Sequence, residues 1–398
     1  MSYSTNIALA LAGLSMSAGL FLLLLFVILG FTAILVYWFF TIFSGQKTKK
    51  QSHKITVQLI RSEKNPILAP VPEHAWEAEA VFNPAAVVEG ERVHLFYRAL
   101  GPEGISRIGY ASSLDGIHFD TRLPYPVYDL GAGALPTHMS PYRPLSYNTD
   151  IYASGGGWGG TEDPRAITMD NHVYMSFGIF ESWQSMRMAV TALSFENLRL
   201  CNFAWLPHIT MSPKMQTHKN WVLFPEKING KYAILHALTP DITIDYIDAL
   251  EDLRENPIES NNKRSGREGA WDAFVRGAAS PPMKTKEGWL LLYHGMSPKE
   301  PHIGYKVGAM LLDLEDPTKI LHRSNTPILE PKEWYENDWK PGVVYASGAV
   351  IFKDELIVYY GGGDKFIAAA TAPLDSFLHS LCNNTPLELH SAGTILKD

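Results

Sequence analysis

One carboxylate stands out as a candidate functional group because of its neighbours. Asp163 lies in the segment Gly160-Thr-Glu-Asp-Pro-Arg165, where a proline follows it directly and an arginine comes two positions later. A residue before proline is biased toward extended backbone, which would aim the Asp163 side chain away from a strand ladder. An isolated Asp-Pro pair usually marks a turn. Because this pair opens an apolar run and is followed by Arg165, we interpret Asp163 as a functional acid.

A second group of candidates is cationic. Arg276 precedes the segment Gly277-Ala-Ala-Ser-Pro-Pro282, and His294 ends a later strand-like run. Lys219 and His236 stand near the ends of two further apolar runs. An isolated cation is usually solvated, and an isolated strand histidine is usually a core residue. Several cations around one acid instead favour an anion site, because clustered Lys, Arg and His donors attract anions.

A third group is typical of sugar recognition. It consists of Asn83, Arg98 and Asp364, which stand beside aromatic residues in the sequence. Amide and carboxylate groups beside aromatic rings are common partners of sugar hydroxyls. The alternatives are turn capping by Asn83 and a surface ion pair for Arg98.

These candidates lie at the openings and ends of five similar stretches, and the repetition indicates the fold. Each stretch has a small or polar opening, a short apolar run, a polar turn and a second apolar run, usually followed by a third. The stretches span residues 83–97, 163–177, 224–235, 280–293 and 347–360. Repeats of about 40 to 80 residues made only of strands are typical of propeller blades. We therefore predict an all-β, five-bladed β-propeller whose strand openings surround a funnel suited to a small polar ligand.

Composition narrows the class of protein. The chain has 398 residues and a formal net charge of −7, which gives no reason to expect nucleic-acid binding. Cys201 and Cys382 are far apart and match no metal-ligand spacing, so we predict free thiols and no metal site. The globular part has almost no helical pattern, the main exceptions being residues 247–254 and 373–381.

The N-terminal segment predicts a membrane anchor. Residues 6–43 contain no charged side chain, and about 20 apolar residues suffice to cross a bilayer once. A re-entrant hairpin is an alternative, and so is a cleaved signal peptide, although no Lys or Arg precedes the segment. The segment is followed by a basic stretch, and the positive-inside rule then places the globular part in the cytoplasm. The basic residues are Lys47, Lys49, Lys50 and Lys54.

The predicted organisation therefore has four parts. We expect a transmembrane helix over residues 6–43 and a basic polar linker over residues 44–58. A propeller catalytic domain over residues 59–385 and a C-terminal tail over residues 386–398 complete the chain.

Seven strings in order, between about residue 65 and residue 381, resemble glycoside hydrolase family 130, the β-mannoside phosphorylases and hydrolases. They begin at Asn83-Pro-Ala-Ala-Val, Glu162-Asp-Pro-Arg165, Leu223-Phe-Pro-Glu-Lys, Pro281-Pro, Gly308-Ala-Met-Leu-Leu-Asp, Pro327-Ile-Leu and Tyr359-Tyr-Gly-Gly-Gly-Asp364. The family fold is a five-bladed propeller, in agreement with the repeats.

The resemblance implies a role for each candidate. Asp163 is similar to the family's catalytic acid, which protonates the glycosidic oxygen through a hydroxyl of the mannosyl ring while inorganic phosphate attacks with inversion. The implied substrate-binding residues are Asn83, Arg98, Arg165 and Asp364. The implied phosphate-binding residues are Lys219, Arg276, His294 and Tyr305. The implied partners are a β-mannoside oligosaccharide and inorganic phosphate as co-substrate, with no other cofactor.

The chain departs from the family pattern at the phosphate site. Lys219 stands where Arg is usual, His236-Ala-Leu238 stands where another Arg is usual, and Arg276 stands where Lys is usual. Since Lys and Arg are not equivalent at an oxyanion site, we expect weakened or reshaped phosphate binding.

Three functions follow. The first is an inverting β-mannoside phosphorylase, and the second is a related β-mannosidase or mannosyltransferase in which Glu226 or another carboxylate assists. The third is a non-catalytic sugar-binding propeller. The sequence leaves the linkage, the acceptor and the oligomeric state open.

Overall fold

The chain divides into two compact units, Met1–Ile55 and Thr56–Asp398. A computed structural model describes residues 59–130, 157, 159–182, 185–297 and 304–383, together with residues 23, 29, 30, 32 and 34. The second unit consists mainly of antiparallel strands. The predicted linker over residues 44–58 and the predicted tail over residues 386–398 lie outside the described residues.

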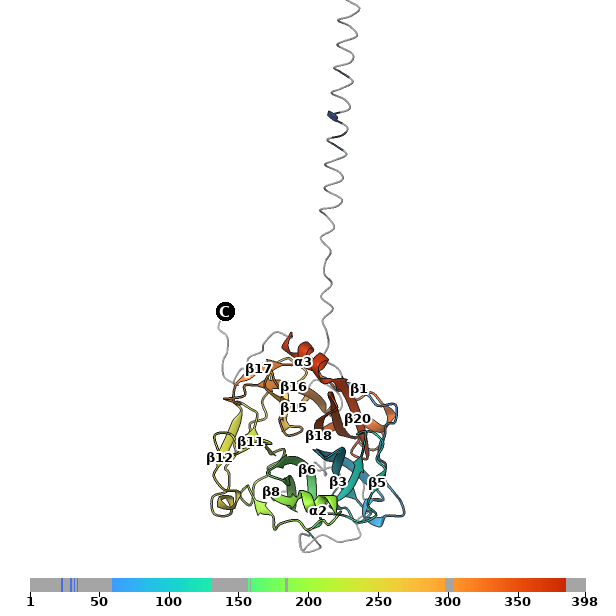
Figure 1. Ribbon diagram of the computed structural model, residues 1–398, viewed down its shortest axis with the longest axis vertical. Helices are drawn as coiled ribbons and strands as arrows, with labels where there is room; N and C mark the ends of the chain where they lie inside the picture. Colours follow the sequence, from blue (N-terminus) through green and yellow to red (C-terminus); the bar gives the residue numbers. More distant parts are fainter. Residues whose placement is uncertain are drawn as a thin grey trace, which may run out of the picture. The chain divides into compact units, whose positions relative to one another are not determined.

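The strands are arranged as five blades in a ring (Figure 1). The first two blades belong to one eight-stranded sheet, because Ile105 and Ser106 pair in parallel with Gly159 and Gly160. The first blade consists of β2 (Ala80–Glu89), β3 (Arg92–Leu100), β4 (Ile105–Ser113) and β5 (Thr121–Arg122), and the second of β6 (Gly159–Met169), β7 (His172–Ser182), β8 (Ser185–Ser194) and β9 (Ile209–Thr210). The third consists of β10 (Val222–Leu223), β11 (Tyr232–Ala237) and β12 (Thr243–Ile247). The fourth consists of β13 (Phe274–Ala278), β14 (Met283–Lys284), β15 (Trp289–Met296), β16 (Lys306–Leu312) and β17 (Ile320–Arg323).

The fifth blade closes the ring with both ends of the unit. It contains β18 (Val344–Phe352), β19 (Glu355–Gly362) and β20 (Phe366–Pro373), and β1 (Ile60–Arg61) adds its outer strand by pairing with β20. The first strand of the unit and its last strand thus belong to one sheet. The inner strand β2 contacts both β18 and β6, so the first blade lies between the fifth and the second.

Five apolar clusters hold the blades together, one between each pair of neighbours. Their members alternate along the strands: Leu290 and Leu292 of β15 pack toward the fifth blade, whereas Leu291 and Tyr293 pack toward the third. This alternation follows from the two-residue period of a strand. Because both faces of a middle strand are covered, such strands appear in the sequence as continuous apolar runs.

The few helices are short. They are the 3₁₀ turns η1 (Ala75–Glu77), η3 (Leu250–Arg254) and η4 (Trp334–Glu336), and the α-helices α2 (Phe195–Arg199) and α3 (Leu374–Cys382). The helical patterns at residues 247–254 and 373–381 thus fall on η3 and α3. The inner strand begins before the predicted opening in all five blades, and β10 and β13 also end before the predicted openings at residues 224 and 280.

The predicted membrane anchor is the main correction. Of residues 6–43, only five are described; they are helical, with Leu23, Leu29 and Ile34 exposed, and the rest lie outside the described residues. A crossing needs about 20 apolar residues in one helix, and the described residues contain no helix that meets this requirement of length and apolar character. The transmembrane helix in the predicted fold class is therefore wrong, and so is the cytoplasmic, single-pass placement that depended on it.

Candidate active site

Part of the candidate site is built from residues that the strand ladders skip. The pairing register of the inner strands shifts between Phe82 and Ala85, between Glu162 and Arg165, between Val275 and Gly277, and between Ala346 and Gly348. The skipped residues are Asn83-Pro84, Asp163-Pro164, Arg276 and Ser347. A bulge leaves such residues without ladder partners and turns their side chains in a new direction, as often happens beside active sites.

Backbone conformation at the bulges differs from the prediction. Asn83 and Asp163 both have a φ of 47°, in the left-handed region, so the expected extended backbone at Asp163 is wrong. Both residues precede a proline, which has no N–H to contribute to a ladder and is therefore tolerated at a bulge. The left-handed region is accessible to Asn and Asp more readily than to most residues. In the third blade, Asn220 has a φ of 66° just before β10.

Asp163 accepts hydrogen bonds from two of the predicted sugar-binding residues. Nδ2 of Asn83 donates to its Oδ1 over 2.8 Å, and Nη1 of Arg98 donates to the same oxygen over 3.1 Å. Burial alone raises the pKa of Asp163, but the charges of Arg98, Lys219 and Arg165, together with the Asn83 bond, hold that pKa below its ordinary value. The carboxyl group is therefore ionised in the free protein.

Glu162 is a second buried carboxylate next to Asp163 in the chain. Nη2 of Arg98 donates to its Oε1 over 2.9 Å, and Nζ of Lys219 donates to its Oε2 over 3.2 Å. Arg98 thus contacts both carboxylates, while Nε of Arg98 is held by Oγ of Ser106 at 3.0 Å. These contacts fix the orientation of the guanidinium and keep Lys219 close to the catalytic candidate.

One pocket brings together most of the predicted residues. It is lined by Asn83, Arg98, Asp163, Lys219, Arg276, Tyr305 and Asp364. We call it the axial pocket. The guanidinium carbon of Arg276 lies 5.7 Å from the centre of the Tyr305 ring. Asp364 accepts a hydrogen bond of 2.9 Å from Lys340, which also lines the pocket.

Two predicted residues lie behind this pocket instead. Arg165 is 1% exposed and donates to the Asp163 carbonyl at 2.8 Å, to Asn220 Oδ1 at 2.8 Å and to the Tyr345 hydroxyl at 3.1 Å. His294 is fully buried, with its ring stacked on Tyr345 at 4.1 Å between centroids. Burial, followed by the charge of Arg165, holds the pKa of His294 well below its usual value, so the ring is neutral. Both residues support the lining of the pocket.

Sequence reasoning missed several residues of the site. Glu162 stood in the quoted motif without an assigned role, and Asn220 follows the predicted Lys219. Tyr345 opens the last blade, where an aromatic residue beside a bulge was a usable signal. Lys340 lies in a loop with no pattern that could have indicated it. Glu226, considered as a second carboxylate, is half-exposed and pairs with Lys284 at 2.7 Å away from the axial pocket.

A ring of five blades with acid, amide, guanidinium and phenol groups at its bulges has the features of a carbohydrate-active propeller. Residues 150–383 match the glycoside hydrolase 130 family, described as beta-1,4-mannooligosaccharide phosphorylase. The chain belongs to glycoside hydrolase family 130, which confirms the resemblance found in the sequence.

Individual relatives agree. The chain is 36% identical to the beta-1,2-mannobiose phosphorylase of Thermoanaerobacter sp. (strain X514), over 79% of this chain and 96% of that protein. It is 35% identical to the 1,2-beta-oligomannan phosphorylase of the same organism, over 79% of this chain and 97% of that one. The structure of beta-1,2-mannobiose phosphorylase from Listeria innocua with beta-1,2-mannobiose is similar with a TM-score of 0.59 and 27% identity, covering 81% of this chain and 99% of that chain.

Proposed function

We propose that the protein is an inverting β-mannoside phosphorylase, which transfers a mannosyl group between a β-linked mannoside and inorganic phosphate to form α-mannose 1-phosphate. The observation that carries the proposal is that Asp163, Lys219 and Arg276 line one pocket. An acid supplies the proton for the leaving oxygen, and the cations attract an oxyanion, which are the two requirements of phosphorolysis. Family membership and the names of the relatives support the same activity.

In the proposed reaction Asp163 is the general acid. Its proton passes to the glycosidic oxygen through a hydroxyl of the mannosyl ring while the bond from that oxygen to the anomeric carbon breaks. A phosphate oxygen forms the new bond to the anomeric carbon from the opposite face, so the configuration inverts. One acid is enough because phosphate is already a nucleophile, whereas an inverting hydrolase needs a second carboxylate to activate water. No organic cofactor or metal enters these steps.

Phosphate binding prepares Asp163 for this role. In the free protein, burial raises the pKa of Asp163, but the charges of Arg98, Lys219 and Arg165 outweigh burial and keep the group ionised. A phosphate dianion beside Lys219 offsets part of this positive potential and adds negative charge, and both changes raise a carboxyl pKa. The bound nucleophile thus shifts Asp163 toward the protonated form that a general acid needs, which favours protonation of the leaving group during phosphorolysis.

Around the acid, we propose that Asn83, Arg98 and Asp364 hold the mannosyl group. Arg165 and His294 act as positioning residues, because hydrogen bonds to protein groups occupy the first and complete burial encloses the second. Lys219, Arg276 and Tyr305 remain the proposed phosphate ligands.

We propose a 1,2-linked mannoside as the preferred substrate. The relatives at 36% and 35% identity, each over 79% of the chain, are named for 1,2-linked mannosides. The beta-1,4-mannooligosaccharide phosphorylase of Ruminococcus albus is 26% identical over only 55% of the chain. Equal or faster phosphorolysis of β-1,4-mannobiose would reject this preference.

The activity is tested by incubating the full-length protein with β-1,2-mannobiose, with and without inorganic phosphate, and assaying α-mannose 1-phosphate and free mannose. We expect mannose 1-phosphate only when phosphate is present. Free mannose at the same rate without phosphate would make the protein a hydrolase. If neither product formed, the result would favour the non-catalytic, sugar-binding function.

Substitution of the acid gives a sharper test. We expect Asp163→Asn to lower kcat by about 10²- to 10⁴-fold, the usual contribution of a positioned general acid. Glu226→Gln is the matched control, since it removes a carboxylate on the surface and should leave kcat unchanged. A large loss with Glu226→Gln would support the alternative in which Glu226 assists catalysis.

A further inference from the structure

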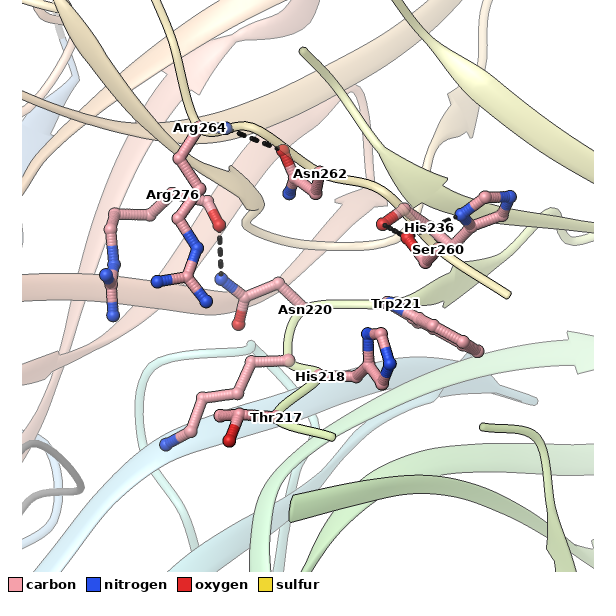
Figure 2. A pocket seen from close by; sticks show the side chains of 10 residues that line it. Thr217, His218, Asn220, Trp221, His236, Ser260, Asn262, Arg264 and Arg276 are labelled. Atoms are coloured by element: carbon pink, nitrogen blue, oxygen red, sulfur yellow. Dashed lines mark hydrogen bonds between the residues drawn. The ribbon is translucent and has the colours of Figure 1, made fainter. Parts of the chain in front are cut away.

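A second hollow adjoins the axial pocket and carries a cation that the sequence did not indicate. Lys219, Asn220 and Arg276 line both hollows, and Arg264, His236 and Ser260 line only the second (Figure 2). We call this hollow the side pocket. Arg276 and Lys219 therefore stand at the boundary between the two, within reach of an anion placed on either side.

Local backbone contacts hold Arg264 in place. Its N–H donates to Oδ1 of Asn262 over 3.1 Å, and its carbonyl accepts from the N–H of Val275 over 3.0 Å. Its φ of 56° lies in the left-handed region, so the chain turns sharply at this residue. The contact with Val275 fastens the loop to β13 one residue before the bulge at Arg276. Figure 2 shows the two guanidinium groups extending side by side in the same direction.

Two neighbouring guanidinium groups require a counter-charge. In the described part of the chain no carboxylate lies within 4.0 Å of the nitrogens of Arg264 or Arg276. Most other buried or half-buried arginines have such a partner; Arg98, Arg122 and Arg323 pair with Glu162, Glu77 and Asp272. Burial and the neighbouring charge of Arg276 lower the pKa of Arg264. The pair is thus electrostatically unfavourable unless an anion lies against it.

The remaining residues of the side pocket do not supply that anion. Burial lowers the pKa of His236, so its ring is neutral near pH 7, and its Nδ1 is hydrogen-bonded to Ser260 at 2.8 Å. The Asn220 side chain is used by the protein itself: its Oδ1 accepts from Arg165, and its Nδ2 donates to the Arg276 carbonyl at 3.2 Å. The side pocket thus has positive charge on one wall and neutral groups on the other.

We propose that Arg264 and Arg276 together bind the attacking phosphate, and that Arg264 is a specificity-determining residue that favours phosphate over water as the mannosyl acceptor. This inference rests on the proposed function. Two planar guanidinium groups can each offer a pair of N–H donors to phosphate oxygens, a geometry that a lysine cannot reproduce. Phosphate held at the boundary of the two hollows lies beside Lys219 and next to the sugar site.

The first test measures phosphate binding without catalysis, by calorimetric titration of inorganic phosphate into the full-length protein. We expect Arg264→Gln to weaken phosphate binding by roughly ten- to a hundredfold, as loss of a charge-assisted contact does, and Arg264→Lys to restore only part of it. Lys263→Gln is the matched control, because it removes the same charge from the adjacent, exposed residue. Phosphate affinity unchanged in Arg264→Gln, or lowered equally in Lys263→Gln, would overturn the inference.

The second test uses the reaction itself. We expect Arg264→Gln to raise KM for phosphate by a similar factor, leave KM for β-1,2-mannobiose within about twofold and increase the ratio of free mannose to mannose 1-phosphate. A folded variant is verified by a Tm that is not lowered in the absence of phosphate, where relief of the repulsion from Arg276 should if anything raise it. Loss of phosphate affinity in a protein that performs no phosphorolysis would sustain the anion site and reject the proposed function. Normal phosphorolysis with an unchanged KM for phosphate would reject the role of Arg264 alone.

Discussion

His294 is a buried base whose protonation is opposed by its surroundings. Burial, followed by the charge of Arg165, lowers its pKa well below the ordinary value near 6.5. The unfolded chain therefore binds a proton at this residue below about pH 6.5, while the folded protein stays neutral there. Stability contributed by the neutral ring is complete above pH 6.5 and is lost as the pH falls, by up to about 1.4 kcal/mol per pH unit.

The variant His294→Phe tests whether the neutral His294 ring makes the free energy of unfolding fall as the pH falls. The phenyl ring keeps the stacking on Tyr345 but cannot titrate. Between pH 6.5 and pH 5, the free energy of unfolding of the wild-type protein should fall more steeply than that of the variant, as measured by urea denaturation. Parallel slopes would show that His294 gains its proton in the folded protein. Other histidines titrate in both proteins and cancel in the comparison.

Some residues of the site could be predicted from the sequence and others could not. Asp163, Asn83 and Arg98 were found because they open or end apolar runs with a distinctive neighbour, and they do meet in the axial pocket. Arg264 was missed because its place depends on a left-handed turn and a loop-to-strand contact, neither of which has a sequence period. The sequence showed that the family's arginine is absent near His236. It did not show that Arg264, from a loop, places a guanidinium group in the adjoining side pocket.

At the scale of strands and turns, three blades share one brace made of a buried acid, a buried tyrosine and an arginine. The acid precedes the inner strand, the tyrosine lies on the middle strand, and the arginine lies on the outer strand. The sets are Glu77 with Tyr97 and Arg122, Asp272 with Tyr293 and Arg323, and Glu336 with Tyr360 and Arg61. Each brace connects the outer strand of a blade to the turn that begins it.

Removing the acid of one brace should be costly. Asp272 accepts from Arg323 at 2.6 Å and from the Tyr293 hydroxyl at 2.7 Å, and all three are fully buried. We expect Asp272→Asn to lower the free energy of unfolding by about 3–5 kcal/mol, because Arg323 is left as a buried charge without its partner. Glu226→Gln, which breaks an exposed pair, should cost no more than about 1 kcal/mol. Equal losses in urea denaturation would contradict a special role for the brace.

The repeated turns were visible in the sequence as Ala75-Trp-Glu77, Ala270-Trp-Asp272 and Trp334-Tyr-Glu336. Their spacing from the following strand differs between the blades: Glu77 lies three residues before β2, Asp272 two before β13 and Glu336 eight before β18. The turns therefore indicate a blade without fixing where its inner strand begins. The bulges were not predictable in the same way, because a skipped pair depends on the neighbouring strand. Apolar runs therefore located the middle strands well and the short inner strands β10 and β13 less well.

At the scale of the whole second unit, ring closure depends on a strand of two residues. Arg61 of β1 donates to both oxygens of Glu336, at 2.7 and 2.9 Å, and to the Glu330 carbonyl at 2.5 Å. We expect Arg61→Gln to speed amide hydrogen exchange in β20 by about ten- to a hundredfold, since one charge-assisted hydrogen bond contributes about 1.5–3 kcal/mol. Exchange in β7 of the second blade should stay unchanged.

Lys332→Gln is the control for Arg61→Gln, because it removes a charge from the exposed side of the same region. If exchange in Arg61→Gln became faster to the same extent in all blades, the ring would open in one cooperative step. Pairing of β1 with β20 would then not open separately from the rest of the ring. Unchanged exchange in β20 would show that apolar packing alone holds the ring closed.

At the bulges, positioning of functional side chains is separated from the strand pairing that holds the blade together. Residues within the ladders fix the shape of each blade, whereas Asn83, Asp163, Arg276 and Ser347 occupy positions that the ladders have released. Three of these residues, Asn83, Asp163 and Arg276, line the axial pocket, so a change at one of them alters the chemistry there while the strand pairing continues on both sides of the bulge. Exchange of a few side chains at the bulges can therefore change which acceptor the site takes, while the fold of the propeller stays the same.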